Sequence, residues 1–285
     1  MHANAQLLAF LQHDETGMQT QLAWARGNPE AEAAILQGIG REKAYHGQFR
    51  ESQMILHKAE ERFQNMAERV KSSYLANEMT EFHLDLAQQE AESGSLGDAQ
   101  HLLSSLREGD PRLVLFSRDF ALLDARAGDV ERAQKIAFSI KRSLPVDTLV
   151  QNFTLPAIYA AIKLRQNDPA GAIALLQPAL RYDLAYPQLG FNNLYPAYLR
   201  GLAYLQMGDG RLAAPEFQKL IDHPAIVGRN EIGALAYLQL GRAQTMAGDK
   251  AAARNSYETF LTLWKDADSD IPAIKQAKAE YAKLH

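Results

Sequence analysis

One group of side chains in this sequence has the spacing of a metal site. Asp266, Asp268 and Asp270 alternate like the first three ligands of a calcium-binding loop. Such a loop also needs glycine at its sixth position and glutamate at its twelfth, where this chain has Ile271 and Ala277. We therefore expect no metal site here and interpret the three aspartates as an acidic turn that caps the helix after them.

Other side chains that commonly carry out catalysis form no recognised pattern. None of the eight histidines stands four residues from another, and the H-E-x-x-H metal motif is not found. The chain has no cysteine, which excludes thiolate metal sites and a cysteine nucleophile. It also lacks the G-x-S-x-G turn of serine hydrolases. We expect a protein that is not an enzyme and that uses no cofactor.

Aromatic residues concentrate in one part of the C-terminal half. They are Tyr182, Tyr186, Phe191, Tyr195, Tyr198 and Tyr204. Tyrosine is common in binding grooves because it combines apolar area with one hydrogen-bonding group. Alternatively, these side chains pack the connection over residues 181–195 against neighbouring helices. The sequence leaves both alternatives open.

The composition is that of an ordinary globular protein with a slight acidic excess. The 285 residues include 30 basic and 34 acidic side chains, for a net charge of −4. Nucleic-acid binding requires a clustered basic excess, so we expect no such partner. No apolar run approaches the ~18 residues of a membrane span, and Met1–Leu11 lacks the features of a signal peptide. We expect a soluble chain, either cytoplasmic or extracytoplasmic as the part of a larger protein that follows a membrane span.

A short motif recurs along the chain and predicts how its helices are arranged. The pattern Gly-Asp-x-x-x-Ala begins at Gly128, Gly208 and Gly248. Variants begin at Asn167, Gly94 and Gly47, and a weak seventh begins at His13, with successive spacings of 34, 47, 34, 39, 41 and 40 residues. Glycine, or else asparagine, adopts the left-handed conformation that ends a helix, and the Asp or Ser after it can cap the next one. Each motif therefore predicts a turn between two helices.

Residues on either side of these turns indicate how the two helices pack. Seven positions before the anchor, the residue is small in six of the seven cases, which allows close approach of a neighbour. Nine and twelve positions after the anchor, the residue is always apolar or aromatic, and these offsets share one helical face. Prolines and Gly190 predict extended connections over Arg142–Phe153 and Arg181–Tyr195.

The motif resembles the tetratricopeptide repeat (TPR), a helix–turn–helix unit of about 34 residues. The match is best over residues 190–265 and weakest over 1–70; the usual aromatic residue four positions before the turn survives only as Tyr204. The resemblance implies an all-α fold: one right-handed solenoid over residues 1–285, with about seven degenerate helix pairs. A capping helix over 272–284 would close it, with Ile274, Ala277, Tyr281 and Leu284 on one face.

Four C-terminal segments resemble a narrower family. They are Leu149–Pro156, Tyr195–Leu205, Glu216–His223 and Leu261–Leu284. They are similar to the C-terminal TPR region of acidobacterial eukaryotic-like Ser/Thr protein kinases and winged-helix TPR regulators. This resemblance implies a sensory or partner-binding part of a signalling protein. The kinase motifs are missing, and Arg118-Asp119-Phe120 is the nearest approach to one.

In TPR proteins the first helix of each pair lines the concave surface, where some members hold a partner's terminal carboxylate with Lys, Arg and Asn. The corresponding positions here are Gln37, Arg41, Leu84, Gln88, Arg118, Leu122, Ala157, Ala161, Tyr198, Leu202, Leu238 and Arg242. None of them is asparagine, so we do not expect a carboxylate clamp. The C-terminal end of this surface is instead apolar.

We predict a non-catalytic module that binds a protein or a peptide with bulky apolar side chains. The predicted partner-binding residues are Tyr195, Tyr198, Leu202, Leu205, Leu235, Leu238 and Arg242. A competing interpretation fills this groove with residues 181–195. Two other functions stay open: a scaffold that associates with copies of itself, and an α-helical enzyme without a recognisable motif.

Overall fold

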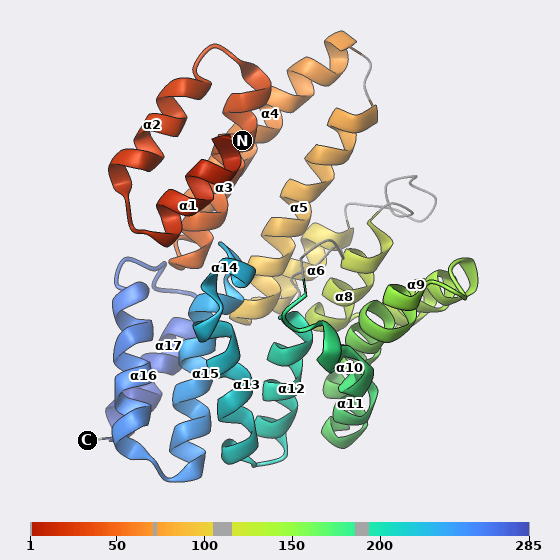
Figure 1. Cartoon of the computed structure of the whole chain (residues 1–285), viewed down its shortest axis with the longest axis vertical. Coiled ribbons are helices and arrows are strands. Elements are labelled where there is room, and N and C mark those ends of the chain that lie inside the picture. Colours follow the sequence, from red (N-terminus) through yellow and green to blue (C-terminus); the bar gives the residue numbers. More distant parts are fainter. Residues whose placement is uncertain (1, 71–72, 105–115, 186–193, 285) are drawn as a thin grey trace.

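All the secondary structure in the described part of the chain is helical, as the computed structural model shows (Figure 1). The structure describes residues 2–70, 73–104, 116–185 and 194–284, and these contain no strand. The α-helices are α1 (His2–Leu11), α2 (Glu15–Ala25), α3 (Pro29–Tyr45), α4 (Phe49–Val70), α5 (Ser73–Ser93), α6 (Leu96–Ser104), α8 (Ser117–Ala127), α9 (Val130–Ser143), α10 (Leu155–Arg165), α11 (Pro169–Leu176), α12 (Tyr195–Gln206), α13 (Gly210–Asp222), α14 (Pro224–Val227), α15 (Ile232–Ala247), α16 (Lys250–Leu263) and α17 (Pro272–Tyr281). Shorter helical turns are η1 (Val150–Thr154), η2 (Gln177–Tyr182) and η3 (Ala282–Leu284). The predicted all-α class is confirmed, and no helix in the described ranges is long and apolar enough to cross a membrane.

The turns between helices lie where the recurring motif predicted them. A residue with positive φ stands at each of the seven anchors: His13, Gly47, Gly94, Gly128, Asn167, Gly208 and Gly248. After five of these anchors an aspartate carboxylate accepts a hydrogen bond from the backbone N–H three residues further on. These aspartates are Asp14, Asp129, Asp168, Asp209 and Asp249. The motif thus ends one helix and caps the next by local chemistry.

Glycines inside the helices let successive helices approach closely. A Cβ atom added to Gly201 would lie 2.6 Å from the Phe217 ring, and one added to Gly241 would lie 2.9 Å from Tyr257. Both pairs join the position seven residues before an anchor to the position nine residues after it. The small residue thus allows the close approach that the sequence indicated, and its neighbour in both pairs is the aromatic residue nine positions after the anchor.

Two connections differ in part from the extended form predicted for them. Helix α9 continues to Ser143, and the chain becomes helical again at η1, a π-helical turn that leads directly into α10. The carboxylate of Asp147 starts this turn by accepting the N–H groups of Leu149 and Val150. The connection predicted over residues 181–195 begins with the end of η2, and residues 186–193 lie outside the described part.

The N-terminal and C-terminal helices pack against each other. In Figure 1, α15, α16 and α17 lie directly below α1 and α3. The Trp264 indole N–H donates to the carbonyl of Tyr45 at 2.9 Å, and the N–H of Asp268 donates to the carbonyl of Gly47 at 3.0 Å. Trp264 is 1% exposed and contacts Phe49 edge to face. We call this contact of residues 45–50 with residues 263–271 the junction.

The last helix has the buried face that the sequence predicted. Pro272 lies in the first turn of α17, and Ile274, Ala277 and Leu284 are buried, whereas Tyr281 is half-buried. Ile274, Ala277 and Leu284 belong to one core cluster with Trp264 and Phe49. The helix therefore helps to support the junction.

Candidate functional site

Most of the seven residues predicted to bind a partner lie inside the fold. Tyr195 and Tyr198 on α12 and Leu235 and Leu238 on α15 are at most 1% exposed. Leu202 and Leu205 are half-buried against the same core that contains the two tyrosines. The structure thus brings α12 and α15 together as neighbours, but their apolar side chains do not form the exposed wall that we expected.

Two leucines of this strip belong to a buried cluster that also includes residues from the N-terminal half of the chain. Leu235 and Leu238 share a core cluster with Ala44 and Phe49, which belong to α3 and α4. The competing interpretation placed residues 181–195 over the strip; of the aromatic residues that it involves, Tyr186 and Phe191 are outside the described part. Arg242 is engaged as well, because its guanidinium forms two hydrogen bonds with Glu280 at 2.8 and 2.9 Å.

A buried ionic group explains the position of Tyr195. The Glu92 carboxylate, which is fully buried, accepts two hydrogen bonds from the Arg126 guanidinium at 2.7 and 2.8 Å. The Tyr195 hydroxyl donates to the same carboxylate, and burial raises the pKa of Tyr195 well above its usual range. These three residues join α5, α8 and α12. Arg126 compensates the buried charge of Glu92 and Tyr195 donates a further hydrogen bond to it, so removal of the arginine alone would leave an uncompensated buried charge.

A second acid in the interior is not compensated in this way. Glu231 precedes α15 and is 5% exposed, and its Oε1 atom has no hydrogen-bond partner. Burial, together with the negative charges of Glu92 and Asp85, raises the pKa of Glu231 to about 8. Asp85 itself accepts hydrogen bonds from Gln37 and Arg41. Glu231 is therefore protonated at neutral pH, and it must lose its proton in a poorly solvated place when the pH rises.

We expect Glu231→Gln to stabilise the protein at high pH. The folded-state pKa of about 8 lies above the ordinary 4.5, so the cost of ionising Glu231 grows between these values and is complete above pH 8. Urea unfolding should show a gain of up to about 5 kcal/mol at pH 9 and under about 1 kcal/mol at pH 5. The control is Glu131→Gln, because Lys135 lowers the pKa of Glu131, which is exposed. Equal pH profiles for the two variants would contradict the assignment.

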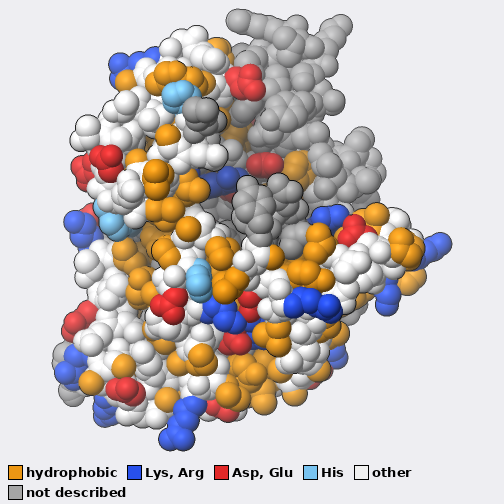
Figure 2. Space-filling view, viewed as in Figure 1, with side chains coloured by type: hydrophobic (Ala, Val, Ile, Leu, Met, Phe, Trp, Pro, Cys, Tyr) orange, Lys and Arg blue, Asp and Glu red, His pale blue; other side chains and the backbone are white. Residues whose placement is uncertain are grey.

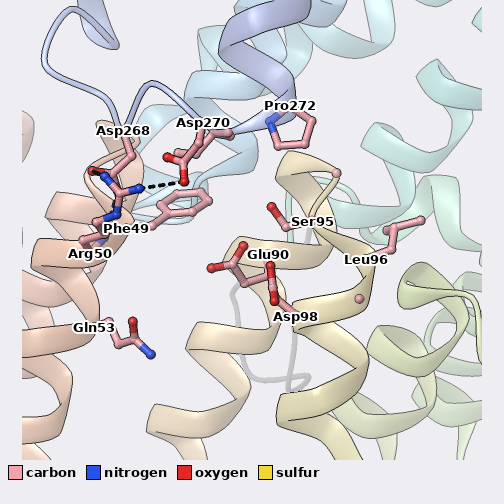
Figure 3. A pocket seen from close by; sticks show the side chains of 13 residues that line it. Phe49, Arg50, Gln53, Glu90, Ser95, Leu96, Asp98, Asp268, Asp270 and Pro272 are labelled. Carbon is pink, nitrogen blue, oxygen red and sulfur yellow. Dashed lines mark hydrogen bonds and ion pairs between the residues drawn. The ribbon is translucent and has the colours of Figure 1, made fainter.

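An open pocket with an acidic lining lies beside the junction (Figure 3). We call it the junction pocket; its volume is about 480 Å³. Its walls come from the start of α4, from the turn between α5 and α6, and from the segment before α17. The lining residues are Phe49, Arg50, Gln53, Glu90, Gly94, Ser95, Leu96, Gly97, Asp98, Asp268, Asp270, Ile271 and Pro272. Three segments that are far apart in the sequence therefore build one cavity.

Charges in the junction pocket do not balance. Arg50 is held on one side by Asp270, at 2.6 Å, and by Asp268, at 3.7 Å. Figure 3 shows Glu90 and Asp98 on the other side, where no basic residue lines the pocket. Burial raises the pKa of Glu90, and the negative charges of Asp98, Asp270 and Asp268 raise it as well. A cation that entered here would relieve this repulsion.

The sequence contained part of this site without showing where it belongs. In the sequence, Asp268 and Asp270 belong to a pattern that resembles the start of a calcium-binding loop, and Gly47 belongs to a predicted turn. Their contact, 3.0 Å between Asp268 N and Gly47 O, spans 221 positions, and no local pattern encodes it. Trp264 in the L-W-K-D-A-D-S-D-I-P segment was a signal for this contact. A large aromatic residue beside an acidic turn needs an apolar surface to pack against.

Models of known protein families and the curated proteins give no match to this chain. Its function is therefore inferred from the residues and the geometry described above. The junction pocket is the candidate site because it combines a cavity of ligand size with an uncompensated charge.

Proposed function

We propose that this chain is a non-catalytic interaction module that binds a protein or peptide, and that a Lys or Arg side chain of the partner enters the junction pocket. The module would be a TPR-type solenoid and a part of a bacterial signalling protein, as the sequence resemblances imply. The seven turns with positive φ and the close contacts of Gly201 and Gly241 support the repeat architecture. The site, however, would differ from the apolar strip that the sequence predicted.

The charge distribution in the junction pocket carries this proposal. Asp268 and Asp270 already neutralise Arg50, whereas Glu90 and Asp98 have no cation beside them in the lining. A long side chain with a terminal charge suits the pocket, because its methylene groups can lie against Phe49 and Leu96 while its end reaches the two carboxylates. The backbone of the peptide would stay at the surface.

Short synthetic peptides test the proposal. We expect acetyl-Ala-Ala-Lys-Ala-Ala-amide and its arginine version to bind at low salt, measured by isothermal titration calorimetry. The norleucine version keeps the chain length but loses the charge, so it should bind at least about tenfold more weakly. Asp98→Asn should weaken the lysine peptide by about tenfold as well, since it removes one of the two uncompensated carboxylates.

Glu131→Gln is the matched control, because this exposed carboxylate lies on α9, outside the pocket lining. It should leave the affinity for the lysine peptide unchanged. Equal affinity for the lysine and norleucine peptides, or no binding of any of the three, would exclude the junction pocket as a site for basic side chains.

A further inference from the structure

The outer surface at the end of α9 exposes apolar side chains that the fold does not use. Phe138 is 59% exposed and Val146 is 91% exposed, and Leu144 and Leu149 are 38% and 39% exposed. Lys141 and Arg142 lie between them in the sequence. We call these six residues the α9 patch. Figure 2 shows hydrophobic and basic side chains together at the right-hand edge of the molecule, where Figure 1 places α9.

Packing of α9 explains why Phe138 cannot turn inward. Ala133, Ala137 and Ile140 are buried and fix the face that contacts the core. Phe138 is one position after Ala137 and two positions before Ile140, which puts it away from that face by the 3.6-residue period. A phenylalanine at such a position adds nothing to the core and costs solubility. Together with the other exposed apolar side chains of the patch, it is typical of a contact surface.

The basic residues of the α9 patch are available to such a partner. Lys141 and Arg142 form no ion pair with any residue in the described part, and the Arg142 guanidinium lies 5.8 Å from the centre of the Phe138 ring. Of the nearest acids along the chain, Glu131 pairs with Lys135 at 2.8 Å. Asp147, between Val146 and Leu149, accepts two backbone N–H groups but keeps its negative charge. The patch and Asp147 together thus have a formal charge of +1, in a chain whose net charge is −4.

We infer that the α9 patch docks an acidic amphipathic helix of a partner protein. The apolar face of that helix would cover Phe138 and Val146, and its flanking Asp or Glu side chains would pair with Lys141 and Arg142. The inference does not rest on the proposed function, because the α9 patch is separate from the junction pocket and has the opposite charge.

The charges favour this occupant over two others. A second copy of the chain, packed on the same patch by two-fold symmetry, would bring the basic residues of both copies together. An anionic membrane surface is usually bound by about four to eight clustered basic residues, and the patch offers only Lys141 and Arg142 in a chain of negative net charge. A partner with both acidic and apolar side chains matches everything that the patch exposes.

Designed helical peptides test this inference. The probe is a fluorescein-labelled 16-residue helix with leucine on one face and glutamate on both flanks; a second peptide has the same composition in scrambled order, and a third has lysine in place of glutamate. We expect fluorescence anisotropy to show binding of the first peptide only, weakened by added salt. Phe138→Ser and Arg142→Glu should each weaken it by about tenfold or more, because aromatic and arginine anchors dominate such contacts.

Met54→Ser on α4 is the control, since Met54 is 58% exposed and thus matches Phe138 in exposure. Circular dichroism checks that all three variants keep the helical fold, which is the result expected of surface substitutions. The inference is overturned if the scrambled or lysine peptide binds as well as the probe, or if Phe138→Ser binds it like Met54→Ser. The inference is also overturned if the probe does not bind. It is overturned as well if the chain binds phosphatidylserine vesicles and Phe138→Ser and Arg142→Glu weaken that binding as much as they weaken binding of the probe.

Discussion

Gly47→Ala lowers the free energy of unfolding by about 2–5 kcal/mol, the first of two large effects that we expect. The φ of Gly47 is +72°, a region that costs an L-residue about 1–2 kcal/mol. The new Cβ atom would also lie 2.7 Å from the Trp264 ring and 2.7 Å from the Cβ of Ala267. Because Trp264 is packed inside the junction, it cannot move away freely, and such overpacking costs about 1–3 kcal/mol more.

Gly27→Ala separates the two contributions. Gly27 has a similar φ of +83°, but a Cβ atom there meets nothing within 4 Å. It should therefore show the backbone cost alone, about 1–2 kcal/mol. Urea unfolding monitored by circular dichroism gives both numbers. If the two variants lose the same free energy, Trp264 does not rest on Gly47 in solution and the junction is not formed as described.

Arg126→Leu is expected to cost about 3–5 kcal/mol at neutral pH. The substitution leaves the buried carboxylate of Glu92 without its cation, and the Tyr195 hydroxyl then remains as a neutral donor to it. Urea unfolding at pH 7, monitored by circular dichroism, measures this loss.

Arg242→Leu is the control for this prediction. It breaks the ion pair of Arg242 with Glu280, whose side chains are 25% and 31% exposed. Water solvates the remaining carboxylate, so the expected cost is about 1 kcal/mol or less. The double variant Glu92→Gln with Arg126→Leu should recover part of the loss, since it leaves no buried charge. Equal costs for Arg126→Leu and Arg242→Leu would mean that burial at Glu92 is not what makes the pair important.

The parts of the fold that the sequence predicted are those that depend on neighbouring residues. A positive φ at Gly128 and the capping carboxylate of Asp129 act within about four positions, so one short motif encodes them. The same holds for the proline that begins α17. Contact of Gly241 with Tyr257 was predictable because a helix–turn–helix unit fixes the distance between those positions.

The candidate site was not predictable in the same way. The apolar residues of α12 and α15 matched a binding surface, yet Leu235 and Leu238 are buried in a core cluster that also includes Ala44 and Phe49. An apolar strip looks the same in the sequence whether a partner or the chain itself covers it. Equally, Glu90 and Asp268 carry no mark that they share a pocket, because only the junction brings them together.

The junction joins residues that are far apart in the sequence, and this separation affects how the chain folds. Stacked helix pairs that contact only their neighbours can unfold piece by piece. Here the hydrogen bond from Trp264 to Tyr45 spans 219 positions, and a contact of such long range forms slowly because loop-closure entropy opposes it. Unfolding of α16 then also removes contacts at the end of α3, which makes unfolding of the chain more cooperative. A fragment that lacks residues 49–53, 90–98 or 268–272 cannot assemble all the walls of the pocket.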